Sequence, residues 1–210
     1  KEAPNQLIYI QQLHAKKAIG ASLYSGSMLY TTQVLDAAVQ TINALHKINP
    51  FDFGISLGDV ANSTQYNETR WYIDVLDGKV INPSSGANLG AKKIDYQKPF
   101  KAAGLDKTIP WYQTLGNHDH FYMGSIPVDY GIRKDLRQSY ISDAVFAAGD
   151  VLKNPGFINN NDYYMGVIDG STRYGDIKFA GPVANFKKTP KVVADPNRRS
   201  LLRTEWMKEF

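Results

Sequence analysis

The sequence contains no cysteine, which excludes disulfide bonds and thiolate zinc sites. No apolar run approaches the roughly 18–20 residues that a membrane-spanning helix needs. The opening residues, "KEAPNQLIYI", lack the basic and apolar segments of a signal peptide, although a mature chain without its leader would look the same. The remaining composition, 43% hydrophobic and 21% charged over 210 residues, is typical of one globular domain.

The chain also lacks a long basic block. Its net charge of +4 and its pI near 9.0 permit a nucleic-acid or membrane partner. However, the basic residues occur as short groups, for which a solvated surface is the ordinary role: Lys16-Lys17, Lys92-Lys93, Lys187-Lys188 and Arg198-Arg199. Nucleic acid is therefore permitted but unsupported as a partner. The compartment is unknown, although the Asn- and Tyr-rich composition slightly favours an exported bacterial protein.

Helix-like and strand-like segments alternate in the first half of the chain. Residues 29–48 have apolar side chains at helical spacing, and residues 64–76 again look helical. "FDFGISLGD" (residues 51–59) is a short apolar run that suits a buried strand, and residues 109–115 suit a second strand that also ends in Leu-Gly. This order predicts an α/β architecture with a largely buried sheet.

Later segments have weaker patterns. Residues 77–105 are rich in Gly, Ser, Asn and Pro without a sustained period, which predicts an insertion within a single domain of residues 1–210. Residues 134–148 fit a helix, and a further helix is predicted to begin near Arg198. "YYMGVIDGSTRYGDIKFAG" fits a hairpin with a tight turn at Asp169-Gly170.

Polar side chains follow both predicted strands, at the point where each strand ends. Asp59 and Asn117 each come after a strand and a single Gly, and parallel neighbouring strands would bring these ends together. A carboxylate can bridge two divalent ions, and an amide oxygen is a neutral, hard ligand. His118 could then donate a proton or a hydrogen bond to a substrate oxygen, with Asp119 placed to orient its imidazole.

The alternative is that Asp59 and Asn117 cap the helices that follow them. Either residue alone favours capping, whereas "LGD" and "LGNHD" together, both after apolar runs, favour a metal site. Such a site suits hydrolysis of a phosphate ester, because two metal ions about 3.5–4 Å apart offset the substrate charge and activate a water. His120 either lines the pocket or simply lies on the loop. His14 and His46 lack a matching motif and are predicted to be structural or surface residues.

These residues resemble a known family. "GISLGDVANS" and "YQTLGNHDHF" look like the second and third signature blocks of the calcineurin-like metallophosphoesterases, and the resemblance covers roughly Val34 to Tyr122. The closing "RRSLLRTEWMKEF" is similar to the helix that precedes the family's late histidine blocks. The resemblance implies a layered α/β/β/α metallophosphoesterase-like sandwich, incomplete in this chain. Asn62 lies where the family often has a polar residue near the site.

The resemblance also implies a reaction: hydrolysis of a phosphate mono- or diester by a dinuclear centre, with a metal-bound hydroxide as nucleophile. Asp59 would bridge two divalent ions of manganese, iron or zinc, and Asn117 would bind the second ion. His118 would assist the leaving group, with Asp119 behind it. The implied partner is a phosphate-ester small molecule.

Two family blocks have no counterpart here. The Asp-x-His block expected before the first helix is not matched, and no histidine follows His120. The chain is therefore interpreted as a fragment, whose site further segments of a parent chain would complete. The alternative is a non-catalytic binding or interaction domain that retains the scaffold without a complete metal site.

Overall fold

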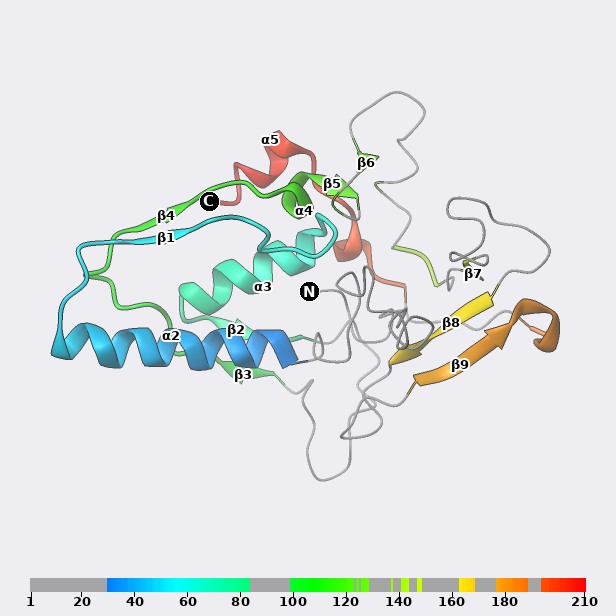
Figure 1. Cartoon of the computed structure of the whole chain (residues 1–210), viewed down its shortest axis with the longest axis horizontal. Helices are drawn as coiled ribbons and strands as arrows, with labels where there is room; N and C mark the ends of the chain where they lie inside the picture. Colours follow the sequence, from blue (N-terminus) through cyan, green and yellow to red (C-terminus); the bar gives the residue numbers. More distant parts are fainter. Residues whose placement is uncertain are drawn as a thin grey trace, which may run out of the picture.

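A computed structural model shows a mixture of helices and small sheets, which is an α/β fold (Figure 1). It describes residues 30–83, 99–122, 124, 126–128, 137, 141–143, 147–148, 163–168, 177–188 and 194–210. The helices are α2 (Thr31–Ile48), α3 (Tyr66–Leu76), α4 (Asn117–His120) and α5 (Arg203–Trp206), with 3-10 turns η4 (Val183–Asn185) and η5 (Pro196–Arg198). Every helix within these ranges is too short or too polar to cross a bilayer.

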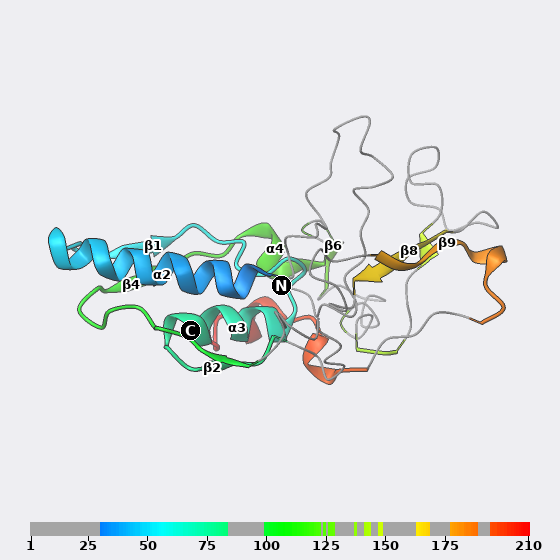
Figure 2. The same ribbon diagram turned by 90° about the horizontal axis from the view of Figure 1, so that it is seen from below.

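The strands form four small sheets within the described ranges. They are β1 (Gly54–Ser56), β2 (Val80–Ile81), β3 (Phe100–Lys101), β4 (Trp111–Gln113), β5 (Phe121–Tyr122), β6 (Ile126–Pro127), β7 (Ala147–Ala148), β8 (Tyr163–Ile168) and β9 (Ile177–Pro182). β1 pairs with β4, β2 with β3, and β5 with β6, while β7, β8 and β9 form a three-stranded sheet. Figures 1 and 2 both place β8 and β9 at the end of the molecule away from the body of α2.

The parallel pair β1–β4 confirms that the two predicted strands are neighbours. Ile55 lies opposite Tyr112, and α3 lies between the two strands in sequence. In Figure 1, α2 and α3 both lie on the same side of this pair. The prediction of a largely buried sheet is wrong for the other side, because Ile55 is 49% exposed and Leu57 is 81% exposed.

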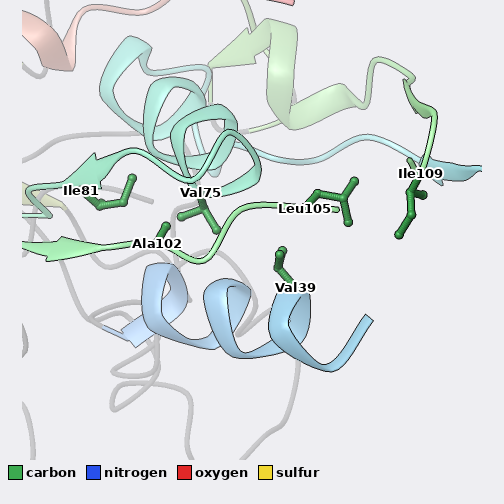
Figure 3. Packing of buried hydrophobic residues seen from close by; sticks show 6 residues of the cluster. All are labelled: Val39, Val75, Ile81, Ala102, Leu105 and Ile109. Carbon is green, nitrogen blue, oxygen red and sulfur yellow. The ribbon is translucent and has the colours of Figure 1, made fainter. Parts of the chain in front are cut away.

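The hydrophobic core lies between α2 and α3. The segment that carries Ala102 and Leu105 runs between these helices, and Val39 of α2 points towards it from one side (Figure 3). The fully buried members of this cluster are Val39, Val75, Ile81, Ala102, Leu105 and Ile109. One buried carboxylate reinforces the packing, since Asp36 of α2 accepts the backbone N–H of Ala103 at 2.7 Å.

The core includes both ends of the stretch that the sequence predicted to be an insertion. β2 and β3 pair antiparallel, and Ile81, Ala102 and Leu105 are buried. The two ends of residues 77–105 therefore pack with the core, while residues 84–98 lie outside the described residues, so the insertion stays a prediction. The sequence shows no period at these ends because two-residue strands are too short to have one.

Replacing Ile81 with alanine is expected to lower the free energy of unfolding by about 2–5 kcal/mol, because it leaves a cavity in the core. Ile81 is 1% exposed, whereas its neighbour Val80 is 64% exposed and provides a matched control. Val80→Ala is expected to change stability by less than about 0.5 kcal/mol. Denaturant titration measures both values, and equal effects would contradict the inclusion of β2 in the core.

Three predictions concern later segments. The hairpin is confirmed as β8–β9, in which Ile168 pairs with Ile177, and the turn predicted at Asp169-Gly170 lies outside the described residues. The predicted helix of residues 134–148 is wrong at its end, because Ala147–Ala148 is strand β7, and most of its other residues lie outside the described ones. The last helix begins at Arg203 and not near Arg198.

Candidate active site

The site is built where β1 and β4 end. A Cβ atom at Gly58 would overlap the backbone of Gly116, and a Cβ atom at Gly116 would overlap both the backbone and the carboxylate of Asp59. Gly58 also has a φ of 96°, which L side chains rarely adopt. The two glycines therefore allow the ends of β1 and β4 to touch. Asp59 directly follows Gly58 in the sequence, and Asn117 directly follows Gly116.

Asp59 uses one of its two carboxylate oxygens for a hydrogen bond within the site. The residue is exposed and has a φ of 57°, a left-handed conformation that aspartate tolerates better than most residues. Its Oδ1 accepts the backbone N–H of His118 at 3.0 Å. Its Oδ2 accepts no hydrogen bond from the part of the chain that the structure describes, so this oxygen can serve as a ligand.

Asn117 is the first residue of α4 and is also exposed. Its side-chain Nδ2 donates to the carbonyl oxygen of Gly124 at 2.8 Å. Because this contact fixes which end of the amide is the donor, Oδ1 faces away from Gly124. The amide oxygen is thus set as an acceptor or metal ligand.

The structure does not support the capping alternative in its simple form. α3 follows Asp59, but its N-cap is Gln65, and α4 follows Gly116, which is its N-cap. Neither Asp59 nor Asn117 therefore caps the helix that follows it in sequence. Asp59 instead bonds to the N–H of His118 in the first turn of α4, which ties the two strand ends together.

His118 is held in one tautomer by a backbone carbonyl. Its Nδ1 lies 2.6 Å from the carbonyl oxygen of Asn62, which can only accept, so Nδ1 carries the proton. The neutral ring then has its lone pair on Nε2, and donation from Nε2 requires the imidazolium. The position of Asn62 next to His118 agrees with the placement that the sequence suggested, although the contact comes from the main chain.

Asp119 has a different role from the one predicted for it. Its buried carboxylate accepts three backbone N–H groups, from Asp59 at 2.8 Å, from Ala61 at 3.0 Å and from Gly116 at 2.9 Å. The expected orientation of the His118 ring by Asp119 is replaced by the bond to Asn62. Burial raises the pKa of the Asp119 carboxyl above its ordinary value, and the three N–H groups limit the rise. Asp119 therefore joins the two loops that carry the site.

The other histidines divide between the site and the scaffold. His120 places its Nδ1 2.7 Å from the carbonyl oxygen of Gly116, and its ring contacts Phe121 at the far end of α4. His46 accepts the N–H of Phe51 and contacts Thr108, which confirms a structural role for it. His14 lies outside the described residues.

Sequence reasoning missed two contributors to the site. Glu68 of α3 is buried and accepts the N–H groups of Asn62 and Ser63 at 3.0 Å each, which fixes the loop that holds His118. Gly124, with a φ of 70°, lies against the His118 ring and accepts from Asn117. No motif marks either residue, because each acts through contacts between segments that are distant in sequence or separated by a turn.

The oxygen donors at this site are of the kind that a divalent cation prefers, but there are fewer of them than such an ion takes. A free carboxylate oxygen on Asp59 and an amide oxygen on Asn117 are hard ligands. Divalent ions take four to eight donors, depending on the ion. Within the described ranges, no group of three or more His, Asp and Glu residues is arranged to hold a metal ion.

Comparison with known proteins adds no family assignment. No family model matches the chain, and it matches neither a curated protein nor a solved structure. The resemblance to metallophosphoesterases therefore depends on the residues of the two strand ends alone.

Proposed function

We propose that the chain is a metal-dependent phosphoesterase domain, in which Asp59 and Asn117 hold divalent ions. The observation that carries this proposal is the contact between the two strand ends at Gly58 and Gly116. This contact lies at the carboxyl edge of a parallel pair, the usual ligand site of α/β folds, and the carboxylate of Asp59 and the amide oxygen of Asn117 directly after the two glycines support a metal site there.

Each residue of the site has a defined part in this reaction. Bound divalent ions would offset the charge of a phosphate ester and make a water nucleophilic near neutral pH. His118, with Nδ1–H held by Asn62, presents Nε2, and in its protonated form it donates to the leaving oxygen. Asp119 holds the loops of Asp59 and Gly116 in register.

The finer fold that we propose is the layered α/β/β/α sandwich. Parallel sheets are normally covered on both faces, yet Phe53, Ile55, Leu57 and Tyr112, in or directly beside the β1–β4 pair, are exposed. A second sheet would cover these side chains. Because the chain has no cysteine, Leu57→Cys gives a single thiol whose labelling rate should fall when a segment that supplies this sheet is added; unchanged labelling would argue against the sandwich.

A hydrolysis assay tests the reaction. The chain is incubated with an aryl phosphate monoester or an aryl phosphate diester, in the presence of manganese, iron or zinc salts and then with a chelator. Asp59 and Asn117 supply too few donors by themselves, so water or side chains outside the described residues would complete the coordination. With this coordination we expect product formation that depends on the metal and is lost in Asn117→Ala. The rival, a binding domain without catalysis, predicts no hydrolysis of either ester with any of these metals.

A further inference from the structure

Gly124 touches both side chains that follow Gly116. Its carbonyl oxygen accepts the Asn117 Nδ2–H at 2.8 Å, and its backbone N–H donates to Phe121 at 3.0 Å, which closes the turn after α4. With a φ of 70°, it turns its bare Cα towards the His118 imidazole. A Cβ atom at this position would overlap Nε2, Cδ2 and Cε1 of that ring.

The ring of His118 is therefore held on two sides. Asn62 fixes Nδ1 through its carbonyl oxygen at 2.6 Å, and the backbone of Gly124 supports the edge that carries Nε2. A side chain at residue 124 would displace the His118 ring from this position and cover its Nε2. The same residue selects the amide orientation of Asn117, because only its Nδ2 end can donate to a carbonyl oxygen.

We infer that Gly124 is a positioning residue of the site, which sets the Asn117 amide oxygen and the His118 Nε2 at the same time. The role of these two groups in catalysis rests on the proposed function, whereas the position of the His118 ring does not. One glycine then couples the ligand and the proton donor, so that the hydrogen bond from Gly124 to Phe121 and the site form together.

A double-mutant cycle tests this inference without any metal or substrate. Gly124→Ala adds both the strain of a positive φ and the clash with His118. Gly78→Ala is the matched control, since Gly78 has the same φ of 70° and lies far along the chain from the site, against Gly104. Each glycine variant is measured in the wild-type background and in a His118→Ala background by denaturant titration.

We expect Gly124→Ala to lower the folding equilibrium constant roughly tenfold more in the wild-type background than in the His118→Ala background. The effect of Gly78→Ala is expected to be equal in the two backgrounds. Equal effects of Gly124→Ala in both backgrounds would overturn the inference. If Gly124→Ala alone fails to fold, recovery of folding in the double variant with His118→Ala supports the inference, and continued failure beside a folded His118→Ala protein overturns it.

A spectroscopic measurement adds a signature that a merely structural glycine would not produce. In ¹⁵N-labelled protein, the wild type and Gly78→Ala should show His118 as the Nδ1–H tautomer, and Gly124→Ala should lose this state. If His118 keeps its tautomer and ring shifts in folded Gly124→Ala, the inference is wrong. If coupling is found but no variant or wild type hydrolyses a phosphate ester, the positioning role stands and only the proposed reaction fails.

Discussion

Replacing Asp119 with alanine is expected to lower the free energy of unfolding by about 3–5 kcal/mol, the largest effect of any single change in the site. The carboxylate accepts three backbone N–H groups from two loops and is fully buried. Removing it leaves these donors without their charged partner, and hydrogen bonds to charged groups contribute about 1.5–3 kcal/mol each, although not additively. Denaturant titration of the variant and the wild type measures the difference.

Two matched variants make this result specific. Asp52→Ala removes an exposed carboxylate just before β1 and is expected to change stability by less than about 0.5 kcal/mol. Asp119→Asn keeps the shape but offers only one acceptor oxygen, so its stability should lie between that of Asp119→Ala and that of the wild type. An Asp119→Ala protein as stable as Asp52→Ala would show that Asp119 does not join the two loops.

Replacing Asp59 with asparagine is expected to reduce metal affinity by more than about 100-fold, which exceeds the loss usually seen when a residue behind a ligand is changed. The substitution removes the negative charge that a divalent ion requires. The amide oxygen can still accept the N–H of His118, so the fold should be retained. Metal titration followed by calorimetry measures the affinity, and denaturant titration measures the stability.

Here the control is Asp52→Asn, an equal change of charge at the opposite end of the same strand. It should leave both metal affinity and stability unchanged. Equal metal affinities for Asp59→Asn and the wild type would remove Asp59 from the ligand set and leave it as a partner of the α4 backbone.

The parallel pair and the meeting of its ends were predictable because both are local patterns repeated twice. Each strand is a short apolar run that ends in Leu-Gly and a polar residue, and parallel strands share one carboxyl edge. The helices α2 and α3 were predictable from the spacing of their apolar residues.

The roles of individual side chains were not predictable in the same way. Asp119 is next to His118 in sequence, yet their side chains point to different partners, because α4 directs the carboxylate inward to the Asp59 loop. Ile81 was assigned to an insertion because a two-residue strand carries no period. The contact of Gly124 with the His118 ring depends on a positive φ, which composition alone does not specify.

The most direct test of the account is the number of divalent metal ions bound per chain, measured by elemental analysis after equilibration with manganese or zinc and removal of free metal. We expect roughly one to two ions per chain in the wild type, and none in the double variant Asp59→Asn with Asn117→Ala. No bound metal in the wild type, or equal amounts in the wild type and the double variant, would contradict it, and Asp59 and Asn117 would then be structural residues that join two strand ends.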